Sequence, residues 1–131
     1  MSLTMTDAAV VTRAYDALGK GDLTTVRGCF IEDAVWRLPG HSQVAGEHKG
    51  IEAIIATLIS LKRLSGGTFK AALVEVLVGH DHVVALQRAT GQRDGKTLDA
   101  LGCQLIRLRE GRIASMQGFY ADQYALDDFW S

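Results

Sequence analysis

The sequence predicts an α+β fold of one domain, residues 1–131, in which helices cover one face of a β-sheet. In the first half of the chain, apolar residues recur at helical spacing. From Thr68 onward they alternate with the period of two that is typical of strands. Two turn signals, Asp94-Gly95 and Glu110-Gly111, then divide the second half into consecutive hairpins.

Three helices are expected to form the helical layer. The first ends at about Leu18, before a glycine-rich break. The second is capped by Asp22 and runs through Phe30. The third extends from Ile51 to about Lys62, and its wide apolar stripe implies burial on more than one side.

Strands account for most of the remaining chain. A short strand is expected from Asp33 to Leu38, where Pro39-Gly40 ends it. A polar loop follows, with a brief strand around Val44. A long strand begins at Thr68 and leads into the two hairpins, and residues 123–131 form a short amphipathic tail.

The first hairpin is expected to carry mostly small residues on one face. If Asp94-Gly95 is a two-residue turn, Arg93 faces Lys96 and the register follows by counting outward. The shared face then comprises Ala85, Gln87, Ala89, Gly91, Leu98, Ala100, Gly102 and Gln104. Glycine inside a strand marks the close approach of another group. Either a cavity with glutamines in its lining lies above this face, or a helix packs close to it.

The opposite face of the same hairpin carries bulky apolar residues, among them Leu86, Leu101, Cys103 and Leu105. The predicted helices are already used to cover the other face of the sheet. An apolar sheet face without a cover indicates a homodimer that forms through this outer face.

Composition argues against several classes of partner. The net charge is −1 and the basic residues are scattered, so neither nucleic acid nor an anionic membrane is an expected partner. The chain has no recognisable leader and no run of about 20 apolar residues, so a cytoplasmic location is expected. Cys29 and Cys103 lack metal-ligand spacing, and no metal and no cofactor are predicted.

Four segments together resemble the nuclear transport factor two-like superfamily, which includes ketosteroid isomerases and SnoaL-like polyketide cyclases. They are AYDALGKGD (14–22), CFIEDAVWRLPG (29–40), GIEAI (50–54) and REGRIASMQGFYADQYALDDFW (109–130). The resemblance implies a cone-shaped, curved mixed sheet wrapped around the helices. It also implies a deep pocket for a small apolar organic ligand, usually in a dimer.

The resemblance also selects a register for the second hairpin. A three-residue loop, Arg109-Glu110-Gly111, pairs Gln104 with Met116 and places Gly118 and Tyr120 on the pocket side. Residues matching Met116, Gly118 and Tyr120 line the pocket in the isomerases, so the three-residue loop is predicted here.

The catalytic groups of the ketosteroid isomerases do not carry over. That reaction needs a carboxylate base, a tyrosine and a protonated aspartic acid. Their positions fall on Leu38, on Ala14 beside Tyr15, and on Gln104. The acidic residue of the SnoaL-like cyclases falls on Gly118. Steroid isomerase activity is therefore not expected.

Two ionisable residues remain as catalytic candidates. Asp122 follows an apolar strand and precedes aromatic residues, so burial would raise its pKa and suit it to proton transfer. The alternative is that Asp122 caps the short C-terminal segment, because Asp is common before a short helix. His41 lies in a loop that the resemblance places near the pocket mouth, where it is either a base or an ordinary surface histidine.

Five further residues are candidates for binding a ligand. Gln87 and Gln104 would orient a carbonyl or hydroxyl, or would bond to each other or to water. Tyr15 and Tyr120 would present hydroxyls to the pocket, or would belong to the core. Trp36 shares a strand face with Leu38 and would form an aromatic wall, or ordinary core.

Two functions follow from these patterns. The first is an enzyme that isomerises, cyclises, dehydrates or hydrolyses an apolar, oxygen-bearing compound by acid–base chemistry. The second is a non-catalytic module for ligand binding or dimerisation, since the isomerase groups are absent. A carboxylate or histidine that points into the pocket with a shifted pKa would favour the enzyme.

Overall fold

The computed structural model describes residues 5–131, with four helices and six strands. The helices are α1 (Met5–Gly19), α2 (Leu23–Gly28), α3 (Ile51–Leu64) and α4 (Gln123–Trp130). The strands are β1 (Phe30–Leu38), β2 (Gly46–Lys49), β3 (Lys70–Val78), β4 (Val83–Arg93), β5 (Lys96–Arg109) and β6 (Arg112–Tyr120). None of the described helices has the length and apolar character needed to cross a membrane.

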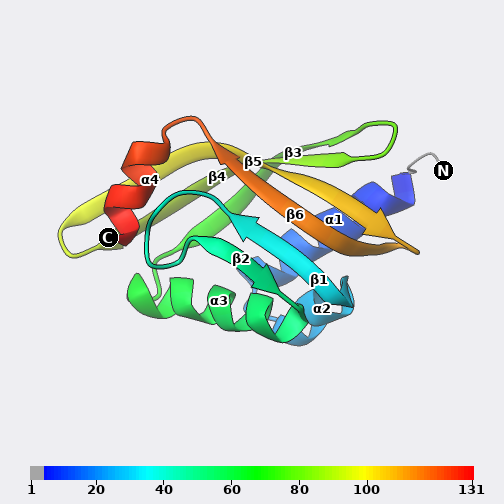
Figure 1. Ribbon diagram of the computed structural model, residues 1–131, viewed down its shortest axis with the longest axis horizontal. Helices are drawn as coiled ribbons and strands as arrows, with labels where there is room; N and C mark the ends of the chain where they lie inside the picture. Colours follow the sequence, from blue (N-terminus) through cyan, green and yellow to red (C-terminus); the bar gives the residue numbers. More distant parts are fainter. Residues whose placement is uncertain (1–4) are drawn as a thin grey trace.

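The strands form one curved, mixed sheet in the order β2-β1-β6-β5-β4-β3. Strands β1 and β6 run parallel, and the other neighbouring pairs are antiparallel. Figure 1 shows α1, α2 and α3 on one side of this sheet and α4 beside the turn between β4 and β5. The result is the predicted α+β cone, with its core between the sheet and the helices.

Local sequence signals explain several of these boundaries. Asp22 caps α2, because its carboxylate accepts a hydrogen bond of 3.1 Å from the backbone N–H of Thr25. The predicted extension of α2 through Phe30 is wrong. The helix ends at Gly28, and Phe30 begins β1 in register with Ile113 of β6. Phe30 is buried in either arrangement, so its hydrophobicity alone does not distinguish helix from strand.

The brief strand predicted around Val44 lies slightly later in the chain. Strand β2 begins at Gly46 and pairs with the end of β1, where Gly46 faces Leu38. Val44 is buried within the preceding loop. The prediction placed the strand at Val44 because Val44 is apolar, but this residue packs into the core from a loop.

The predicted register of the first hairpin is confirmed. Arg93 faces Lys96, and Gln87 faces Gly102. Both turn residues have positive φ, 49° at Asp94 and 77° at Gly95, as a tight two-residue hairpin requires.

The register predicted for the second hairpin is wrong. Arg109 faces Arg112 across a two-residue turn, and an irregularity follows between Arg107 and Leu108. Gln104 therefore pairs with Gly118 rather than with Met116. The irregularity adds one unpaired residue to β6, which shifts the alternation of its side chains just as one extra loop residue would. Met116, Gly118 and Tyr120 therefore still share the inward face, as predicted.

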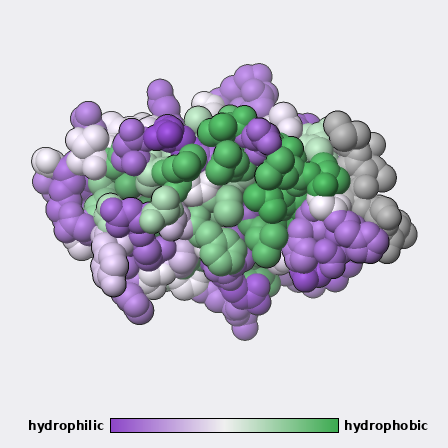
Figure 2. Space-filling model, turned by 90° about the horizontal axis from the view of Figure 1, so that it is seen from above, coloured by the Kyte–Doolittle hydropathy of each residue, from purple (hydrophilic) through white to green (hydrophobic). Residues whose placement is uncertain are grey.

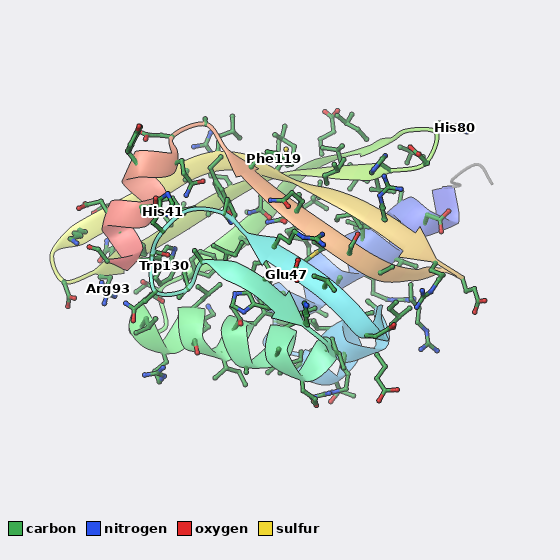
Figure 3. All side chains as sticks on the ribbon, viewed as in Figure 1. His41, Glu47, His80, Arg93, Phe119 and Trp130 are labelled. Atoms are coloured by element: carbon green, nitrogen blue, oxygen red, sulfur yellow. The ribbon has the colours of Figure 1, made fainter. Side chains whose placement is uncertain are left out.

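The outer face of the sheet is apolar and open in the described chain. Its exposed large residues include Val74 at 56% and Phe119 at 51% exposure, together with Leu77 and Leu101. Figure 2 shows a broad hydrophobic area on this side of the molecule. Phe119 points away from the helices in Figure 3.

Candidate functional site

A cavity of about 70 Å³ lies between the inner face of the sheet and the helices. Its wall is predominantly apolar. The polar residues in the lining are Tyr15, Trp36, Gln87, Gln104 and Tyr120. The apolar ones are Ala14, Leu18, Val26, Phe30, Leu38, Ile54, Leu58, Leu61, Phe69, Ala71, Ile106, Ile113, Met116, Leu126 and Trp130.

A directional chain of hydrogen bonds crosses the cavity wall. The Tyr15 hydroxyl of α1 donates to the side-chain oxygen of Gln87 on β4. The side-chain nitrogen of Gln87 in turn donates to the Tyr120 hydroxyl oxygen at 3.0 Å. A tyrosine hydroxyl carries one hydrogen, and no acceptor for that of Tyr120 occurs among the hydrogen bonds of the described residues. The chain therefore ends on a free O–H donor in the cavity wall.

Burial keeps both tyrosines protonated. Removal of the hydroxyl from water disfavours the phenolate and raises the pKa of Tyr120 to about 12, although the hydrogen bond from Gln87 acts in the opposite direction. The pKa of Tyr15 is also raised, chiefly by burial and then by the proximity of Tyr120 and Cys103. At neutral pH both groups are hydrogen-bond donors rather than bases.

Two further polar groups in the wall have no hydrogen-bond partner within the described chain. They are the indole N–H of Trp36 and the side-chain oxygen of Gln104. Trp36 is 6% exposed and Gln104 is 3% exposed. A buried donor or acceptor without a partner costs about 1–3 kcal/mol. The cavity thus offers a bound molecule an unused donor and an unused acceptor.

Gly102 allows the tyrosine and the glutamine to meet. Gly102 lies between Gln87 and Tyr120 in the register of β4, β5 and β6. A Cβ at Gly102 would lie 2.5 Å from Cδ1 of Tyr120 and 2.6 Å from the carbonyl oxygen of Phe119. The Tyr120 ring thus occupies the space directly above this glycine.

Other small residues of the inner face are also covered by side chains. A Cβ at Gly91 would lie 3.3 Å from the ring of Phe129 in α4. A Cβ at Gly118 would meet Pro39 at 3.0 Å and the Gln104 amide at 3.3 Å. Ala89 is fully buried. A cavity therefore lies over one part of this face, and a helix packs close to it at Gly91, where Phe129 of α4 approaches.

The structure brings seven of the predicted ligand-binding residues together in the cavity lining. These are Tyr15, Trp36, Leu38, Gln87, Gln104, Met116 and Tyr120. Ala89, Gly102 and Gly118 lie on the same face but outside that lining. Phe69 and Trp130 line the cavity although the sequence did not indicate it. The end of α4 and the residue before β3 approach the cavity only in the folded chain.

Neither predicted catalytic residue lines the cavity. Asp122 caps α4, where its carboxylate accepts from the backbone N–H of Ala125 at 3.0 Å. His41 is exposed in the loop after β1, and its backbone N–H donates to the Asp127 carboxylate at 3.1 Å. Figure 3 shows His41 near α4. Within the described chain, the cavity lining contains no carboxylate, imidazole, ammonium or guanidinium group.

A family model, a curated protein and a solved structure each match most of this chain. The SnoaL-like domain family matches residues 11–116. The uncharacterised Mycobacterium tuberculosis protein Rv0034 is 34% identical over 97% of this chain and 100% of its own length. Bal32a, from a soil-derived mobile gene cassette, is 40% identical with a TM-score of 0.94, over 97% of this chain and 98% of that chain.

Two further solved structures share the fold. A Xanthomonas campestris protein of unknown function with a cystatin-like fold is 28% identical, with a TM-score of 0.89, over 95% of this chain and 98% of that chain. TerC, co-crystallised with polyporic acid, is 19% identical, with a TM-score of 0.82, over 95% of this chain and 97% of that chain. The chain belongs to the SnoaL-like domain family.

Proposed function

We propose that this protein binds a small, uncharged and largely apolar organic compound, and that Tyr120 donates a hydrogen bond to an oxygen of that compound. The observation that carries this proposal is the directional chain from Tyr15 through Gln87 to Tyr120. Each member orients the next one, so the final O–H is held in place before a ligand arrives. A carbonyl oxygen is the acceptor that suits such a donor.

The lining favours an uncharged group inside the cavity. A buried ion requires a countercharge or several hydrogen bonds, and its desolvation is otherwise very costly. The described lining residues include two tyrosines with raised pKa values but no charged side chain. The unpaired Trp36 N–H and Gln104 oxygen would instead bind a second acceptor and a hydroxyl of the same compound.

Catalysis of a cyclase-type or isomerase-type reaction is the second candidate, and membership of the SnoaL-like family supports it. A Tyr120 hydroxyl aimed at a carbonyl would stabilise negative charge as it develops on that oxygen. The proton to be moved would come from or go to the substrate itself or water, because the described lining lacks a general base. Isomerisation through an enolate, aldol-type cyclisation and elimination of water next to a ketone all proceed through such a polarised carbonyl. TerC, which shares the fold, was co-crystallised with polyporic acid.

A matched pair of probes tests the binding proposal. Acetophenone and α-methylstyrene have nearly the same shape but differ in a carbonyl oxygen, and their binding can be measured by ligand-detected NMR. We expect acetophenone to bind more tightly, and we expect Tyr120→Phe to remove that preference. Tyr124→Phe is the control, because Tyr124 is 90% exposed on α4. Failure of both probes to bind, or the same preference in Tyr120→Phe, would contradict the proposal.

We also propose that the protein forms a homodimer through the outer face of the sheet. Support comes from the exposed apolar residues of β3, β5 and β6, which include Leu77, Leu101 and Phe119. Apolar patches of this kind on a sheet are typical of protein–protein contacts. A two-fold axis would bring the same face of each copy together.

A further inference from the structure

A surface groove of about 620 Å³ adjoins the cavity. It lies between α1, the second half of α3 and the first residues of β3. Five residues line both the groove and the cavity, namely Tyr15, Leu18, Leu58, Phe69 and Ala71. All five are half-buried, as expected of a partition with the cavity on one side and the groove on the other.

The relative sizes of the two spaces suggest that they hold one ligand. The cavity of about 70 Å³ is too small to hold a whole drug-sized molecule. Pockets for drug-sized ligands measure about 300–1,000 Å³. A compound larger than a few atoms would therefore place one end in the cavity and the rest in the groove. The side chains of Leu18 and Leu58 line both spaces and lie between them.

The groove differs from the cavity in its charge. Lys20, Lys62 and Lys70 line it, together with one acidic residue, Asp16. Asp16 pairs with Lys20 at 3.0 Å. Lys62 and Lys70 form no ion pair within the described chain, and the ammonium group of Lys62 lies 3.4 Å from the carbonyl oxygen of Gly67. Positive charge therefore predominates here, in a chain whose net charge is −1.

Strand β3 supplies additional donors at this place. It is an edge strand, and residues 70–73 line the groove in succession. Alternate backbone N–H groups of an edge strand lack a partner from a neighbouring strand on that side. They are available to an anionic oxygen that is held near Lys70.

We propose that the groove binds a carboxylate of the same compound whose apolar, carbonyl-bearing end occupies the cavity. The ligand class is thus an amphipathic keto acid, with its charge at Lys62 and Lys70 and its uncharged end at Tyr120. This inference rests on the proposed binding function of the cavity. The inference adds a second binding site, the groove, to the protein. It also assigns a negative charge to the ligand, which the cavity alone does not specify.

Two compounds of similar shape, one charged and one uncharged, test this inference. 4-(4-Acetylphenyl)butanoate carries a ketone at one end and a carboxylate at the other, and its methyl ester has the same ketone without the charge. Isothermal titration calorimetry at low ionic strength is expected to show about fivefold tighter binding of the acid, the order expected of two exposed ion pairs. Added salt is expected to reduce this difference, because it screens exposed charges.

Charge-reversal variants locate the effect. The double variant Lys62→Glu and Lys70→Glu should abolish the preference for the acid over the ester. Lys49→Glu is the matched control, because Lys49 is an exposed lysine on β2, at the opposite edge of the sheet. It should retain the preference for the acid.

The outcomes separate the two proposals. If the ester binds but the acid binds no more tightly, the groove proposal is overturned and the cavity proposal stands. The same conclusion applies if the double variant retains the preference for the acid. If neither compound binds, the cavity proposal fails and the groove proposal fails with it.

Discussion

The side-chain nitrogen of Gln87 donates to the Tyr120 hydroxyl oxygen at 3.0 Å, across the strand that separates β4 from β6. The residue between them on that strand is Gly102. Because this position has no side chain, the Tyr120 ring lies over β5 and its hydroxyl reaches Gln87. The polar part of the cavity therefore depends on a residue that does not line it.

Replacement of Gly102 by alanine should disturb this arrangement. The new methyl group would lie 2.6 Å from a backbone oxygen, that of Phe119, and 2.5 Å from the Tyr120 ring. We expect a loss of about 1–3 kcal/mol in the free energy of unfolding, as for other overpacked sites. Urea denaturation of the variant and the unmodified protein measures this change in the free energy of unfolding. Gly28→Ala is the control, since no atom lies within 4 Å of a Cβ there. Equal stability of the two variants would show that the close packing at Gly102 has no energetic consequence.

Replacement of Gln87 by methionine should break the hydrogen-bond chain with little change in volume. The hydroxyls of Tyr15 and Tyr120 would both lose their partner. A loss of about 1–3 kcal/mol per unpaired buried group is expected in chemical denaturation. Gln92→Met, at an exposed position of the same strand, should have little effect. An unchanged stability of Gln87→Met would indicate that water replaces the amide.

Stability should fall at alkaline pH through the tyrosines. The pKa of Tyr120 is raised from 10.0 to about 12 in the folded protein. Between these values the unfolded chain releases a proton that the folded chain retains, so the free energy of unfolding decreases as the pH rises. This contribution is fully present below pH 10 and is lost as the pH approaches about 12. Thermal unfolding of Tyr120→Phe should depend less steeply on pH over this range than that of Tyr124→Phe.

The proposed dimer predicts a response to charge on the outer face. Phe119→Glu and Leu101→Glu would place carboxylates in an apolar contact, where they would remain without partners. Analytical ultracentrifugation should show a dimer for the unmodified protein and a monomer for these variants. Tyr124→Glu, on α4, should remain dimeric. A monomer in the unmodified protein at micromolar concentration would rule out the dimer.

Alternation along β4 and β5 was sufficient to identify the two glutamines of the cavity wall. The Asp94-Gly95 turn sets the register by its backbone geometry alone, and counting from it places Gln87 and Gln104 on the buried face. The second hairpin shows the limit of counting. The irregularity after Arg107 is a local adjustment between two strands, and neither strand carries a sequence signal for it.

The sequence alone predicts the fold class, the inward faces of the strands, and the lack of the isomerase groups at the matching positions. These features depend on periodicity and on turn residues, which are local properties of the chain. The tertiary structure decided where the cavity lies above those faces. It covered Gly102 with Tyr120 and Gly91 with Phe129, and it employed Asp122 as a helix cap. These arrangements depend on contacts between residues far apart in the chain. The alternation of apolar and polar residues along one strand contains no information about such contacts.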